Sequence, residues 1–147
     1  MREKITSFEQ LECWQACREL RRFVARNVVR KLGPDEKFRL ADQILRAARS
    51  TTANIAEGYG RFHYIDNAKF CSNARGSAYE VLDHLITAVD EDLIEESLLS
   101  DGRKLVDAAV RLINGYMAYL KGAATRARAG SPFNDPSRAG APAMRAS

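Results

Sequence analysis

Two stretches of the sequence carry polar residues at intervals of three or four, alongside the apolar residues that would bury each stretch as a helix. They combine acids, arginines, hydroxyls and amides, which are the side chains that form charge-assisted hydrogen bonds or hold an anion. We call these residues the polar stripe. Its members are Gln43, Arg46, Ser50, Asn54, Glu57, Arg61, Arg75, Ser77 and Glu80.

The polar stripe has two interpretations. Its acids and arginines lie on two helices that small residues allow to pack closely, so cross-helix pairs would be charge-assisted and selective in geometry. The favoured interpretation is a buried network that fixes the register of the two helices and contains both Glu57 and Arg75. The alternative is an anion or nucleic-acid site in which Arg61 and Arg75 stay exposed.

A second set of residues that could hold phosphate lies nearer the N-terminus. Arg18, Arg22, Arg26 and Arg30 recur every four residues and would form a slanting line on one helix, here called the basic ladder. Like charges at this spacing repel, so a negative partner is expected. The candidates are nucleic-acid phosphate and the acidic run 90-DEDLIEE-96, in the same chain or in a neighbouring copy.

The residues for other chemistry are few. His63 and His84 are the only histidines, and the Glu-x-x-His pairs of a di-iron bundle are missing. The three cysteines, Cys13, Cys17 and Cys71, form no Cys-x-x-Cys pair, so neither a disulfide framework nor a zinc ribbon is indicated. No nucleophile with a base partner and no glycine-rich phosphate loop can be identified. We therefore expect no enzyme activity, metal, cofactor or small-molecule substrate.

Four helices are needed to position the polar stripe and the basic ladder. Apolar residues spaced for one helix face predict them over 11–32, 35–58, 66–93 and 95–124. Their short connections predict an all-α, antiparallel up-down-up-down four-helix bundle. Asp35 is expected to cap the second helix, and Gly76 inside the third is expected to mark the close approach of another backbone.

Length and composition favour one helical domain. The chain has 147 residues, of which 46% are hydrophobic and only four are proline. We expect the bundle domain over 1–125 and a flexible tail over 126–147, because the tail is rich in Gly, Pro, Ser and Ala without periodicity. The charged start MREK and the lack of a long apolar stretch predict a cytoplasmic protein with no membrane partner. The net charge of +4 permits a nucleic-acid partner without requiring one.

Several motifs together resemble one bacterial family. They are Leu40-x-x-Gln43-x-x-Arg46-Ala47-Ala48-x-Ser50, Asn54-Ile55-Ala56-Glu57-Gly58-x-Gly60-Arg61 and Ala74-Arg75-Gly76-Ser77-x-x-Glu80. With Leu11, Trp14 and Glu36 included, the likeness covers roughly residues 8 to 120. The family is the four-helix-bundle family named for reading frames inside intervening sequences of 23S ribosomal RNA genes.

The resemblance implies a four-helix bundle that assembles into a ring-shaped homopentamer. A distantly similar protein is the accessory factor of diversity-generating retroelements, a basic pentamer that works with a reverse transcriptase and its RNA. The chain departs from the family pattern at 50-STT-52, where Ser-Ile-Pro is usual, so the proline kink of the second helix is not expected. Asn73 replaces an apolar residue and is expected at a wet or subunit-facing edge.

These observations predict a non-enzymatic, oligomeric bundle that binds nucleic acid or serves an RNA and reverse-transcriptase system. Phosphate contacts of the basic ladder would then give affinity without sequence specificity. The alternative function is a structural or protein-interaction scaffold with no nucleic-acid role, in which the acidic run neutralises the basic ladder.

Overall fold

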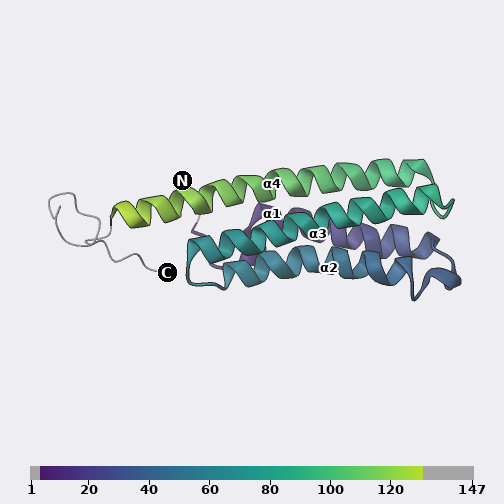
Figure 1. Cartoon of the computed structure of the whole chain (residues 1–147), viewed down its shortest axis with the longest axis horizontal. Helices are drawn as coiled ribbons and strands as arrows, with labels where there is room; N and C mark the ends of the chain where they lie inside the picture. The colour runs from purple at the N-terminus through teal and green to yellow at the C-terminus, as the bar shows by residue number, and fades with distance from the viewer. Residues whose placement is uncertain (1–3, 131–147) are drawn as a thin grey trace.

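Four long helices make up the fold of the computed structural model, which describes residues 4–130 (Figure 1). They are α1 (Glu12–Phe23), α2 (Leu40–Tyr59), α3 (Tyr64–Asp90) and α4 (Glu96–Ala129). Within 4–130 there is no strand, which confirms the all-α prediction. Short helical turns, η1 (Phe8–Gln10), η2 (Val24–Val28), η3 (Val29–Lys31) and η4 (Pro34–Glu36), precede α1 or connect it to α2.

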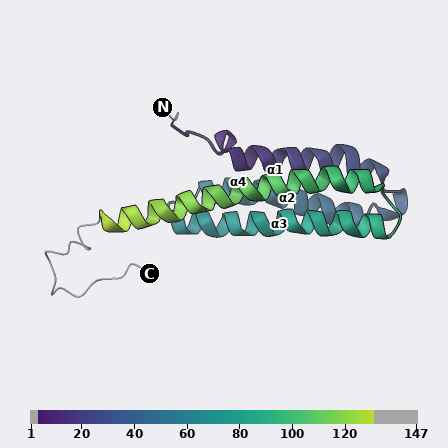
Figure 2. The ribbon, with the colours of Figure 1, turned by 90° about the horizontal axis from the view of Figure 1, so that it is seen from above.

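Each helix packs against its neighbour in sequence, and α1 also packs against α4 (Figures 1 and 2). The core is layered along the bundle. One end layer joins Trp14 of α1 to Ile55 of α2, Cys71 of α3 and Ile113 of α4. The middle layer contains Leu20, Ile44, Leu85 and Val106, all fully buried. A small third layer, Leu32, Leu40, Ala41 and Ala88, closes the other end. Each large aliphatic side chain in these layers contributes roughly 1.5 to 3 kcal/mol by leaving water.

The first predicted helix is not one regular α-helix. After Phe23 the chain continues through η2, a π-helical turn, and then through the 3₁₀ turn η3. Val24 and Val28 remain fully buried through this change. A π-helical turn holds more residues than an α-helical turn, so the residues after it are rotated about the axis relative to those before it.

The second helix begins at Leu40 and not directly after Asp35, so the predicted cap is wrong. Residues 34–36 form the separate turn η4, and Arg39 interrupts the chain with φ −118° and ψ −109°. The carboxylate that reaches the start of α2 belongs to Glu36, whose Oε2 accepts a hydrogen bond from the Leu40 amide at 3.3 Å. This bond satisfies one of the free N–H groups of the first turn.

The interior of α2 is continuous from Leu40 to Tyr59, as expected for a helix without the proline. Two hydroxyls instead bond back to the preceding turn. Thr51 Oγ1 donates to the Ala48 carbonyl at 2.7 Å, and Thr52 Oγ1 donates to the Arg49 carbonyl at 3.3 Å. This back-bonding places both hydroxyls in a buried helix face at little cost, because each one keeps a partner.

The glycine that marks the close approach of α2 and α3 is Gly58 rather than Gly76. A Cβ at Gly76 would meet nothing within 4 Å, so the predicted contact is not made within this chain. A Cβ at Gly58 would lie 2.8 Å from Phe70 Cβ and 3.0 Å from the Asn67 carbonyl oxygen, both on α3. The end of α2 can therefore lie this close to α3 only without a side chain.

Helix α4 is longer than predicted and runs to Ala129, four residues into the segment expected to be tail. Figure 2 shows it extending past the turn between α2 and α3. The remaining tail residues, 131–147, lie outside the described part of the chain. Within the described helices, none combines the length and apolarity needed to cross a bilayer.

Candidate functional site

Three small members of the polar stripe connect α2 to α3. The Ser50 and Ser77 hydroxyl oxygens are 2.8 Å apart, which is a hydrogen bond between the helices. Asn54 donates its Nδ2 to the Ser50 carbonyl at 2.8 Å and to Ser50 Oγ at 2.9 Å. These residues are half-buried. They form the part of the expected network that the structure contains.

The charged members do not form that network. Glu57 pairs at 3.2 Å with Arg61, just past the end of α2, and these side chains are 56% and 49% exposed. Arg75 turns toward α4 and donates its Nη1 to Asn114 Oδ1 at 2.7 Å. The prediction of a buried network containing Glu57 and Arg75 is therefore wrong for this chain. Its cause is geometric, because Glu57 faces solvent and Arg75 lies on the α4 side of α3.

The rest of the stripe is also satisfied locally. Arg46 pairs with Asp42 at 3.2 Å, and Glu80 lies 3.4 Å from His84 Nε2. Gln43 is exposed. Pairs of this kind, four residues apart on a wet helix face, contribute only a few tenths of a kcal/mol. The polar stripe is thus a polar outer face of α2 and α3 with one half-buried edge at the two serines.

The basic ladder is divided by the π-helical turn. Arg18 and Arg22 precede the turn and are half-buried, with the Arg18 guanidinium 5.6 Å from the centroid of the Trp14 ring and Arg22 paired to Glu19 at 3.4 Å. Arg26 lies in the turn, Arg30 lies beyond it, and both are exposed. The ladder is therefore two pairs of arginines that face different directions, and not the regular line that the spacing predicts.

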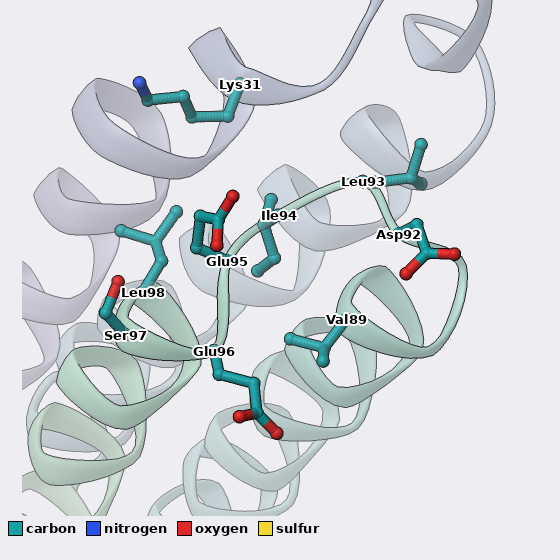
Figure 3. Close-up of a pocket in the computed structure, with 9 residues that line it drawn as sticks. All are labelled: Lys31, Val89, Asp92, Leu93, Ile94, Glu95, Glu96, Ser97 and Leu98. Carbon is teal, nitrogen blue, oxygen red and sulfur yellow. The ribbon is translucent and has the colours of Figure 1, made fainter.

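The acidic run does not neutralise these arginines within the chain. Among residues 4–130 no ion pair joins the basic ladder to residues 90–96. Lys31 lines a hollow with Asp92, Glu95 and Glu96, but in Figure 3 its amino group points away from the three carboxylates. The acidic run is available to another molecule.

Two further arginines lie on α1 and α2 outside the basic ladder, and their spacing did not indicate them as candidate site residues. Arg21 donates its Nη1 to Thr52 Oγ1 at 2.8 Å and so sits on the seam between α1 and α2. Arg49 is exposed on α2, one turn before Thr52. A count of charges by segment does indicate that this part of the chain is basic. Residues 12–61 contain eleven lysines and arginines against six acids, whereas residues 62–129 contain eight against ten.

The buried cysteines are structural side chains. Burial raises the pKa of Cys13 and of Cys71 to about 12 and the pKa of Cys17 to about 11. These thiols are protonated at neutral pH, and a thiol reacts and binds metal as the thiolate. Nearby, Asn67 Nδ2 donates to the Tyr116 hydroxyl at 3.0 Å, and burial raises the pKa of Tyr116 to about 12. In the described part of the chain, no three His, Cys, Asp or Glu residues gather as metal ligands would.

Comparison with known proteins identifies the family. The family described as 23S rRNA-intervening sequence protein matches residues 9–115, which include α1, α2 and α3 and more than half of α4. No curated protein matches the chain. Because the family match covers well over half of the sequence, the chain belongs to the 23S rRNA-intervening sequence protein family.

Proposed function

We propose that this protein is a non-enzymatic RNA-binding protein that works in the bacterial cytoplasm as a ring-shaped homopentamer of up-down-up-down bundles. The observation that supports RNA binding is the lack of carboxylate partners for most of the basic side chains from residue 18 to residue 31. These side chains are Arg18, Arg21, Arg22, Arg26, Arg30 and Lys31. Among the described residues, Arg22 alone of these six side chains has a carboxylate within 4.0 Å.

Cations that have no carboxylate partner favour a polyanion. Each arginine that contacts phosphate releases a condensed counterion, which gives affinity for any sequence. The α1 and α2 segment supplies a net excess of five positive charges for this purpose, because it holds eleven bases against six acids. A ring would present the same surface once per subunit and multiply the contacts with a long RNA.

The proposed assembly is supported by features of the single chain. Each end layer of the core combines the start of one helix with the end of the next, which fits the up-down-up-down arrangement. Ala53 and Gly76 are small exposed residues on the outer face of α2 and α3, and Gly76 has open space beside it. The basic and acidic halves of the chain could meet between copies. Such a head-to-tail contact closes into a ring when the rotation allows.

The test is RNA affinity measured by fluorescence anisotropy between about 50 and 200 mM salt. The variant changes Arg18, Arg22 and Arg26 to Gln, which keeps helix propensity while removing charge. Affinity should fall alike for all sequences, and the salt slope should shrink by about one per lost contact in each engaged subunit. The matched control changes Arg103, Lys104 and Arg111 to Gln, which removes the same charge from the exposed face of α4.

A second candidate function is a protein scaffold without RNA. The opposite charge of the two halves of the chain favours it, because the basic ladder of one copy could pair with the acidic run of the next. If the Arg18, Arg22 and Arg26 variant keeps its RNA affinity but loses particle mass in light scattering, the arginines serve assembly. Absence of RNA binding even at low salt would also favour the scaffold.

A further inference from the structure

The turn between α2 and α3 exposes aromatic and aliphatic side chains that the core does not use. Phe62 is 95% exposed, and Tyr64 and Ile65 in the first turn of α3 are 45% and 40% exposed. The ring neighbour of Phe62 is His63, edge to face at 5.2 Å between centroids. A phenylalanine this exposed contributes little to folding, and its ring remains open to a partner.

The segments that flank this turn carry an excess of positive charge. Arg61 stacks over Phe70 with its guanidinium 4.7 Å from the ring centroid, and its side chain is still half-exposed. The hydrogen bond from Asn67 to Tyr116 places the start of α3 beside α4, which continues for thirteen more residues to Ala129. The segment around the turn, 57–70, and the last part of α4, 116–129, together hold five lysines and arginines against two acids.

We propose that this end of the bundle binds single-stranded nucleic acid by stacking unpaired bases on Phe62 and Tyr64, an inference that rests on the proposed RNA-binding function. We call it the aromatic end, and it consists of Arg61, Phe62, Tyr64, Ile65, Lys69 and Lys121. Open aromatic rings beside a basic groove or surface are how proteins bind single strands without sequence preference, because every base has a π face. The positive charge then contacts the backbone phosphates.

The composition of the aromatic end fits a nucleic acid better than an apolar partner. Its exposed apolar residues are separated by charges, as in 61-RFHYID-66, whereas the core of a protein interface is depleted of charge. The basic ladder begins at the same end of the bundle. Arg18 lies over Trp14, whose core layer includes Ile55 and Tyr59 near the end of α2. One strand could therefore contact both surfaces.

The experiment measures the affinity of the full chain for a fluorescein-labelled 12-nucleotide oligouridylate by anisotropy. Phe62→Ala should weaken binding by about 5- to 150-fold, the range expected for one lost base stack. Binding of a 12-base-pair RNA duplex, whose bases are already stacked on each other, should be unchanged. The salt slope should also be unchanged, because no charge is removed. Phe62 is almost fully exposed, so the variant should fold, which circular dichroism checks.

The matched control is Phe38→Ala. Phe38 is 85% exposed and has the Lys37 amino group 5.4 Å from its ring centroid, so it is also an open aromatic beside a cation. It precedes α2, whereas Phe62 follows it, and the twenty residues of α2 separate the two by about 30 Å. This variant should bind oligouridylate like the unmodified protein.

The outcomes separate this inference from the proposed function. If the unmodified protein binds oligouridylate and Phe62→Ala binds it equally well, the aromatic end is refuted and the RNA-binding function stands. An equal loss for Phe38→Ala, or an equal loss of duplex binding for Phe62→Ala, would also refute stacking at this end. If the unmodified protein binds no RNA at low salt, both proposals fail. Loss of binding to phosphatidylserine vesicles with unchanged RNA binding would assign the aromatic end to membranes and refute the inference.

Discussion

The two helix glycines Gly58 and Gly76 offer a direct test of the packing between α2 and α3. Alanine at Gly76 would meet nothing within 4 Å. It should stabilise the chain by about 0.5 to 1 kcal/mol, because glycine in a helix loses more backbone entropy on folding. The free energy of unfolding of Gly76→Ala should therefore rise.

Gly58→Ala should have the opposite sign. The new Cβ would lie 2.7 Å from Asn67 Oδ1, 2.8 Å from Phe70 Cβ and 3.0 Å from the Asn67 carbonyl oxygen. Asn67 can move only by disturbing its bond to Tyr116, and the other two atoms move only with α3 itself. Overpacking of this kind costs about 1 to 3 kcal/mol, and the propensity gain offsets at most about 1 kcal/mol. A net loss of up to about 2 kcal/mol follows.

Urea denaturation at one fixed protein concentration measures both variants, provided that the m-value is unchanged. Light scattering should accompany it, because Gly76 is exposed and an alanine there could affect assembly as well as folding. The propensity gain is common to both variants and cancels, so the expected gap between them is the overpacking cost of about 1 to 3 kcal/mol. If Gly58→Ala is as stable as Gly76→Ala, α2 and α3 are not in the contact described here.

Three further predictions concern charge, thiols and the tail. Glu57→Ala should cost at most about 0.5 kcal/mol in urea denaturation, because its partner Arg61 is half-exposed and remains solvated; a loss of 3 kcal/mol or more would restore the buried network. The three cysteines should resist a thiol reagent in the native state at pH 8. Their folded pKa values of about 11 to 12 lie above the ordinary 9.0, so the stability that the thiols contribute should be fully present well below pH 9 and be lost as the pH rises from about 9 to 12, and a rise in the unfolding free energy over that interval would contradict the burial of the thiols. Removal of residues 131–147 should leave the melting temperature and particle mass unchanged, and a clear drop in either would show that this segment contributes to the fold or the assembly.

Periodicity was sufficient to predict four helices, because each has a wide apolar face that recurs every three or four residues. Leu20, Ile44, Leu85 and Val106 are all fully buried in the middle layer of the core. Periodicity could not predict the π-helical turn η2. Val24 and Val28 have the four-residue spacing of a regular α-helix, yet both are buried within this turn. The start of α2 could not be predicted either. Asp35 and Glu36 are neighbouring acids that could each bond a free amide of the first turn, and the structure shows that Glu36 does so.

The candidate site was less predictable than the fold, for a geometric reason. Regular spacing tells which residues share a stripe, and Ser50 and Glu57, seven residues apart, differ by only about 20° around an ideal helix. Spacing does not tell which member of the stripe contacts a neighbouring helix, because that depends on where along its length the neighbour lies close. Ser50 faces Ser77 across the helix pair, whereas Glu57 pairs with Arg61, just past the end of its own helix. The glycines show the same limit, since only the packing distinguishes Gly58 from Gly76.

The unequal charge of the two halves of the chain affects how the protein approaches a charged partner, before any contact forms. With eleven bases against six acids in residues 12–61 and eight against ten in residues 62–129, the molecule has an electric dipole as well as a net charge. Such a molecule turns in the field of a polyanion, so a larger share of collisions begins with the basic side in front. Orientation of this kind raises the association rate and is lost as salt shortens the reach of the field to about 10 Å at 0.1 M. Salt should therefore slow the capture of such a partner, in addition to loosening the bound complex.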